Sequence, residues 1–199
     1  MAEIAKEART THATVLYWLK KHNSTRRSWS ESAYVKLNKN GDPFKIPQQL
    51  TRQQWELTIA GLMLYWAEGS KSAQAVRLAN LDGRMLQLFA RFLREVCHVE
   101  EKRLSVYVRV HRQFPIHAAK RYWARLLRLS ASQVLVYPHT DLRSKAERQW
   151  SRYGLATLEF HNTKFKHWLD SAIEQYITRW VGQHATRNKH ATSLNGTNN

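Results

Sequence analysis

The residue best placed to do chemistry in this chain is an acidic side chain at the end of an apolar helix. Residues 52–67 favour a helix that begins after Thr51, a good N-cap residue, and ends at Gly69. Glu68 directly precedes that glycine, so its carboxylate would lie at the helix C-terminus, where the helix dipole slightly disfavours negative charge. A solvated surface carboxylate is the plainer interpretation. The unfavourable position of Glu68 in the field of the helix dipole argues weakly that its carboxylate has a functional role.

Residues 61–69, GLMLYWAEG, resemble a single copy of the motif that names the LAGLIDADG homing endonucleases. In that family, paired motif helices pack at an interface, and each delivers one carboxylate to metal ions at the scissile phosphates for two-metal hydrolysis. The resemblance implies that Glu68 is a catalytic residue and a ligand of Mg²⁺, and that Asn80 lies near the active-site water. It also implies that the helix packs at a dimer interface through Leu64, Ala67 and Gly69.

A single motif implies a homodimer, because the family uses two carboxylates around one duplex, and the target would then be roughly palindromic. Two positions depart from the motif: Met63 stands where the family has Gly, and Trp66 where it has its first Asp. The family binds double-stranded DNA on its sheet. By resemblance, the basic residues expected to contact DNA there are Lys71, Arg77, Arg109 and His111.

Hydrophobic periodicity outlines the elements around the motif. Alternation over 104–111 predicts a half-buried strand with Arg109 and His111 on its polar side. The resemblance implies an α+β fold in which a LAGLIDADG-like domain has an antiparallel sheet and one inserted helix. The other expected strands are 76–79, 134–137 and 155–160, and the expected helices after the motif are 82–96, 115–129 (the insertion) and 165–180.

Residues 2–20 resemble a helix-turn-helix, with two short helices broken near Arg9 and a small residue, Ala5, where the helices cross. Arg9 occupies a turn position that the family gives to Gly, and a left-handed conformation there costs roughly 1 kcal/mol. An ordinary helical hairpin is the alternative. The expected inner faces combine Ile4 and Ala8 with Val15, Trp18 and Leu19. The expected DNA contacts are Thr11 (also an N-cap), His12, Ala13 and Tyr17 in the second helix, and the phosphate-binding residues Lys20, Lys21, Arg26 and Arg27.

Composition favours a nucleic acid as partner. The chain has 199 residues, with 32 Lys and Arg against 15 Asp and Glu and a formal net charge of +17. Its 43% hydrophobic content is enough for a packed core, so a disordered polycation is excluded. An anionic membrane is the main rival, but the basic residues run through the whole chain rather than along one amphipathic helix. With no spanning segment or signal peptide, we expect no membrane partner and a cytoplasmic, nucleoid-associated protein.

Other kinds of chemistry find little support. The single cysteine, Cys97, excludes an intrachain disulfide and a cysteine-based zinc finger, and its place on an apolar stripe predicts a buried thiol. The ten histidines show no zinc-binding spacing, and no Gly-rich phosphate loop is present. A basic loop containing Arg143 and Lys145 is either a solubilising face or a further phosphate contact.

Two hypotheses about function follow. The first is a homodimeric, Mg²⁺-dependent DNA endonuclease, favoured by Glu68. The second is a helix-turn-helix regulator whose LAGLIDADG-like domain holds DNA without cutting it, favoured by Met63; an RNA-binding role comes third, because no RNA-binding module is recognisable. The expected domains are a helix-turn-helix-like segment over 1–23, a basic linker over 24–50, the LAGLIDADG-like domain over 51–180 and a disordered tail over 181–199.

Overall fold

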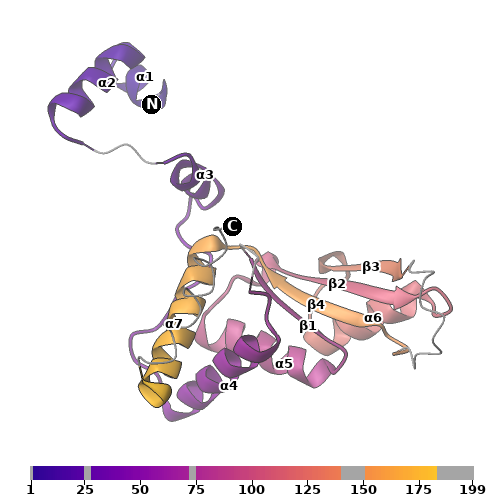
Figure 1. Ribbon diagram of the computed structural model, residues 1–199. Helices are drawn as coiled ribbons and strands as arrows, with labels where there is room; N and C mark the ends of the chain where they lie inside the picture. Colours follow the sequence, from indigo (N-terminus) through magenta and orange to yellow (C-terminus); the bar gives the residue numbers. More distant parts are fainter. Residues whose placement is uncertain (1, 25–27, 72–74, 140–150, 183–199) are drawn as a thin grey trace, which may run out of the picture. The chain divides into compact units, whose positions relative to one another are not determined.

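The computed structural model describes residues 2–24, 28–71, 75–139 and 151–182 of the chain (Figure 1). The chain divides into two compact units, Met1–Asp42 and Pro43–Asn199. The segment 24–50, expected to be a linker, is therefore shared between them. Its first part contains a helix, and Phe44, Ile46 and Leu50 pack against the core of the larger unit.

The smaller unit contains helices α1 (Ala2–Glu7), α2 (His12–Lys21) and α3 (Trp29–Leu37). The break between the first two helices confirms the sequence expectation: Arg9 has a φ of 49°, in the left-handed region, and the Thr11 hydroxyl accepts the backbone N–H of Thr14. A capping box between Ser28 and Glu31 begins α3.

The expected inner faces of α1 and α2 were partly wrong. Ala5 and Val15 are buried between the helices, but Ile4 is 50% and Trp18 48% exposed. Two helices this short share only a narrow strip, which covers side chains at its centre and leaves its flanks in contact with solvent. Trp18 instead stacks on His22, with the two ring centroids 5.6 Å apart.

The larger unit is a mixed α/β domain, in agreement with the expected α+β class. Its strands fall where hydrophobic periodicity placed them, because alternation is a direct signature of a sheet with one covered face. A π-helical turn, Phe92–Val96, extends α5. Along the chain the elements are α4 (Arg52–Glu68), β1 (Val76–Asn80), α5 (Gly83–Arg91), β2 (Leu104–His111), α6 (Ile116–Leu127), β3 (Val134–His139), β4 (Leu155–Phe160) and α7 (Thr163–Val181).

The sheet is mixed, so the expectation of an antiparallel sheet was wrong. The strand order is β1-β4-β2-β3, and β4 runs antiparallel to both of its neighbours, but β2 and β3 run parallel. The reason is α6, which connects β2 to β3. A helical crossover carries the chain back to the end where the first strand began, so the next strand runs in the same direction.

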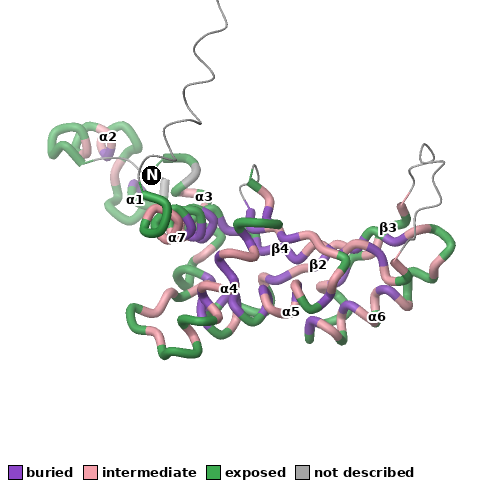
Figure 2. The backbone as a smooth tube through the Cα atoms, turned by 60° about the horizontal axis from the view of Figure 1, so that its bottom comes forward, coloured by how far each residue is buried: buried purple, intermediate pink, exposed green. Residues whose placement is uncertain are grey.

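The two faces of the sheet differ in chemistry. One face carries Val106, Val108 and Val110 of β2 into a core that is completed by α4, α5 and α6, which lie on the same side of the sheet (Figures 1 and 2). Gly61 lets α4 approach this core closely: a Cβ at that position would lie 2.3 Å from Cγ of Phe92. We call the opposite side of the sheet the open face.

Candidate nucleic-acid interface

The open face brings together the strand residues that sequence analysis had proposed as DNA contacts. Arg109 and His111 alternate with the buried valines of β2, so both point away from the core, and Arg109 is exposed. Arg77 of β1 lies opposite Glu159 of β4, which in turn lies opposite Ser105 of β2. The face also carries Ala79, Tyr107, Leu135, Tyr137, His139, Leu155 and Thr157 at matching positions of the register.

A buried carboxylate organises one end of this face. Glu159 is only 7% exposed, and its Oε1 lies 3.2 Å from Nε of Arg77, although that N–H is not aimed for a hydrogen bond. Its Oε2 lies 2.6 Å from Nε2 of His161. A buried charge without compensation is costly, so this cluster anchors Arg77 on the open face. Arg77 is thereby partly neutralised, whereas Arg109 takes part in no ion pair among the described residues.

Two aromatic rings add a flat surface to the open face. Tyr107 of β2 and Tyr137 of the neighbouring β3 stack with their ring centroids 6.3 Å apart and their planes 6° from parallel. Tyr137 is exposed. Cations, hydroxyl groups and aromatic rings together suit contacts with phosphates, sugars and base edges.

The end of the motif helix lies beside the edge of the sheet. Gly69 forms an isolated bridge with Leu78, and the backbone N–H of Ser70 donates to the carbonyl of Arg77 over 2.9 Å. Glu68 is exposed at this position, where α4 meets β1. The carboxylate is thus accessible and close in the fold to the strand that carries Arg77.

Two other residues expected at the site have local structural contacts. The ammonium of Lys71 donates to the carbonyls of Tyr65 and Trp66, so it caps the C-terminus of α4. The side-chain oxygen of Asn80 accepts the backbone N–H of Asp82 over 2.8 Å, which shapes the turn into α5. Their roles in DNA contact and in catalysis stay predictions.

The described residues of one chain do not supply a complete set of ligands for the Mg²⁺ that the resemblance implies. The described residues contain no group of three or more His, Cys, Asp or Glu side chains able to hold a metal ion. Glu68 offers a single exposed carboxylate, and the Asn80 oxygen already accepts a hydrogen bond. The described residues of one chain therefore do not make up a metal centre by themselves.

Helix α4 is apolar on both sides. Its inner side buries Leu62 and Tyr65 in the core, and Leu64 also packs there. Gly69 is buried too, with no space for a Cβ beside the Tyr65 ring. Of the three expected interface residues, only Ala67 is exposed. The outer side of α4 consists of Trp55 and Trp66, which are 45% and 51% exposed, together with Ile59, Ala60 and Ala67.

The smaller unit presents its expected contact residues to solvent. His12 and Ala13 are exposed in the first turn of α2, and Tyr17, Lys20 and Lys21 are exposed further along it. Thr11 uses its hydroxyl as the N-cap of this helix. The other basic residues expected to bind DNA, Arg26, Arg27, Arg143 and Lys145, lie outside the described residues.

Sequence reasoning missed several residues of the open face. Tyr107 could have been assigned to this face from the sequence, because it alternates with the core valines of β2 in the same way as Arg109. The sequence could not assign three other residues to this face, namely Tyr137, Glu159 and His161. Their place depends on which strands pair, and a single sequence does not show strand pairing. Their register with β1 and β2 creates the cluster and the stacked rings.

Comparison of the chain with protein-family models, with curated proteins and with solved structures found no match. Among the described helices, none is both long enough and apolar enough to span a membrane.

Proposed function

We propose that this chain binds double-stranded DNA through the open face of its sheet. The observation that carries the proposal is the placement of Arg77, Arg109 and His111 on one face that α4, α5 and α6 leave uncovered. The net charge of +17 supports it, because a duplex is the commonest large polyanion that a basic domain meets. Phosphate contacts by Arg109 supply affinity, and the neighbouring rings and hydroxyl groups are available to base edges.

Salt-dependent binding tests this proposal. We expect the affinity for duplex DNA to fall steeply with salt, and Arg109→Gln to weaken binding about fivefold and to reduce the log–log salt slope by about one. Lys120→Gln is the matched control, since it removes one charge from α6 on the opposite side of the sheet. Equal losses in both variants would mean that the general charge, and not the open face, attracts DNA.

The smaller unit is proposed to read sequence through the N-terminal end of α2. Exposed His12 and Ala13 occupy the first turn, the part of a recognition helix that meets base edges. We expect Lys20→Ala to weaken binding to all duplexes equally and His12→Ala to change sequence preference. Binding-site selection from a random library measures both. Indistinguishable profiles for the two variants would contradict the assignment.

The outer side of α4 supports a homodimer as the form that binds DNA. Trp55 and Trp66 lie on a helix whose other side is already in the core, and a second copy of α4 offers a matching apolar surface. Sedimentation should give a dimer that Trp66→Glu dissociates. Trp180→Glu, which changes an exposed Trp of α7, is the control and should leave the dimer intact.

DNA cleavage is a second candidate function, favoured by the exposure of Glu68 at the junction of α4 and β1. The test is incubation of the full chain with a randomised plasmid library and Mg²⁺, with Glu68→Gln in parallel. Cutting by the wild type alone at a recurrent site would support a nuclease in which Glu68 acts. Salt-sensitive binding without cutting by either protein would leave DNA binding as the function.

A further inference from the structure

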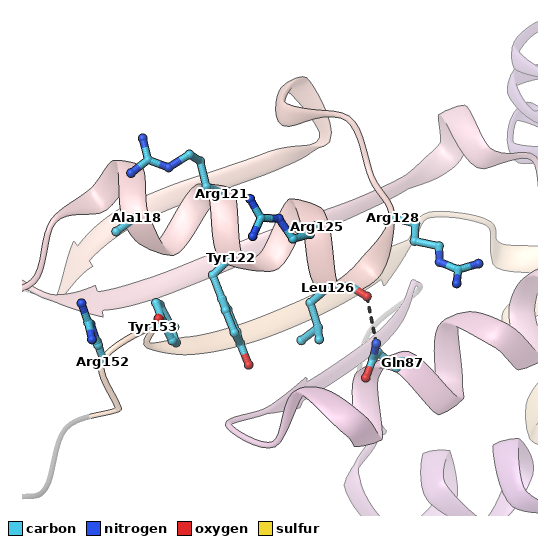
Figure 3. Close-up of a pocket in the computed structure, with 9 residues that line it drawn as sticks. All are labelled: Gln87, Ala118, Arg121, Tyr122, Arg125, Leu126, Arg128, Arg152 and Tyr153. Atoms are coloured by element: carbon cyan, nitrogen blue, oxygen red, sulfur yellow. Dashed lines mark hydrogen bonds between the residues drawn. The ribbon is translucent and has the colours of Figure 1, made fainter.

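A pocket on the helix side of the sheet is lined by four arginines, whose side chains are spread along α6 and the neighbouring segments (Figure 3). It has a volume of about 630 Å³, within the range of small-molecule sites. It lies against α6 and is closed by α5 and by the segment that leads into β4. We call it the arginine pocket; its lining consists of Gln87, Ala118, Arg121, Tyr122, Arg125, Leu126, Arg128, Arg152 and Tyr153.

The walls of the arginine pocket are held in place by specific contacts. Tyr122 and Tyr153 stack face to face, with ring centroids 3.8 Å apart. The indole N–H of buried Trp123 donates to the carbonyl of Tyr153 over 2.8 Å. On the opposite wall, Nε2 of Gln87 donates to the carbonyl of Leu126 over 3.1 Å, as Figure 3 shows. These bonds link α5, α6 and the start of β4, so the shape of the pocket does not depend on a ligand.

The described lining of the pocket is basic and contains no acidic side chain. None of the described residues that line it is Asp or Glu, and no ion pair between described residues includes Arg121, Arg125, Arg128 or Arg152. The carboxylate of Glu95 feels the charge of Arg128, but its pKa is lowered mainly by its hydrogen bond to Arg91, outside the pocket. The C-terminus of α6 attracts cations and accounts for Arg125 and Arg128, but not for Arg121 and Arg152.

We propose that the arginine pocket binds a polyphosphate group, as carried by a nucleoside triphosphate or by free tripolyphosphate. Guanidinium groups bind phosphate oxygens in a bidentate manner. Linked phosphates bring several negative charges into one small volume, whereas a single phosphate would leave most of the four guanidinium groups without a counter-charge. The pocket lies on the helix side of the sheet, so this site is separate from the open face.

Calorimetric titration of the full chain with adenosine triphosphate and, separately, with tripolyphosphate tests the proposal. We expect saturable binding that weakens about tenfold or more in Arg121→Gln/Arg125→Gln, since each lost phosphate contact removes a strong charge-assisted bond. The matched control is Lys120→Gln/Arg179→Gln, which removes the same charge from exposed or half-exposed positions outside the pocket. The control should change affinity less than about twofold, because its residues lie outside the pocket lining and act on the ligand only at long range, where salt screens charges.

The two ligands identify the source of the polyphosphate. Tighter binding of the nucleotide, lost in Tyr122→Leu, assigns the site to nucleoside polyphosphates, whereas equal affinity assigns it to the phosphate chain alone. Equal weakening in the pocket variant and the control would overturn the proposal. So would a single-stranded oligonucleotide without terminal phosphates that displaces the nucleotide, because the pocket would then belong to a nucleic-acid surface. Failure of Arg109→Gln to affect DNA binding would leave this result untouched.

Discussion

At the scale of single residues, burial sets the behaviour of the charged and polar side chains in the larger unit. Glu159 is compensated by Arg77 and His161, and buried Lys166 forms an ion pair with Asp170. Breaking a buried ion pair leaves one charge without a partner, which is more costly than losing an exposed pair. On the open face, the buried carboxylate of Glu159 is thus held by two side chains that are themselves about half exposed.

Gly154 is the backbone position with the least tolerance for a side chain. Its φ is 75°, and a Cβ there would lie 2.3 Å from the carbonyl oxygen of Arg109. We expect Gly154→Ala to lower the free energy of unfolding by about 2–4 kcal/mol, through backbone strain and overpacking together. Chemical denaturation measures the loss. Gly182→Ala, where φ is also 75° but nothing lies within 4 Å, should lose less.

Tyr65 makes stability depend on alkaline pH. Burial, and secondarily the charge of Asp170, raises the pKa of Tyr65 from 10.0 to about 12. The unfolded chain therefore releases this proton first, and the contribution of Tyr65 to stability is lost as pH rises from 10 to about 12. Denaturation at several pH values should show a smaller alkaline loss in Tyr65→Phe. The same alkaline loss in both proteins would contradict the assignment.

At the scale of elements, contacts at the two ends of α4 determine where its last residues lie. Thr51 and Gln54 form a capping box at the start of α4: the Thr51 hydroxyl accepts from the backbone N–H of Gln54, and Oε1 of Gln54 accepts from the backbone N–H of Thr51. Lys71 caps the other end. The position of Glu68 beside β1 thus depends on a helix that is defined at both termini.

Removing the N-cap should weaken this helix measurably. We expect Thr51→Ala to lower the free energy of unfolding by about 1 kcal/mol, because the backbone N–H of Gln54 loses the hydroxyl that accepts it. Thr51→Ser keeps the hydroxyl and should restore most of the loss in thermal or urea unfolding. If Ser and Ala behave alike, the capping box contributes nothing, and packing alone holds the start of α4.

At the scale of the whole molecule, the chain joins a small helical unit to a larger α/β unit with one continuous core. The sheet separates two chemically different sides: the open face with its cations and rings, and the helix side with the arginine pocket. A polyanion bound on one side leaves the other accessible. If both proposals hold, duplex DNA and a polyphosphate would bind on opposite sides of the sheet.

Cys97 is a probe for opening of the larger unit. It is fully buried, and burial raises the pKa of its thiol well above the ordinary value of 9.0, so the reactive thiolate is suppressed in the folded state. We expect a thiol reagent to label Cys97 only through unfolding, at rates that rise with urea and in Gly154→Ala. Chain fully unfolded in denaturant provides the reference rate. Fast labelling of native protein would show local opening near Cys97 instead.

The sequence alone determined the elements and the sides of β2. The alternation of apolar and polar residues in β2 put Arg109 and His111 on the side of the strand away from the core valines. Capping residues such as Thr51 and Asp82 correctly marked where helices begin. These features are local: each depends on neighbours within a few residues, so a single sequence contains them. The left-handed turn at Arg9 was expected from the resemblance to a helix-turn-helix, in which a Gly usually occupies that position.

Only the tertiary structure decided how distant segments meet. The parallel pairing of β2 with β3 and the placement of Arg77 beside Glu159 both depend on strand partners and chain path. The arginine pocket likewise joins residues from α5, α6 and the start of β4. Such contacts are set by packing of apolar faces across the whole core, and spacing along the chain does not encode them.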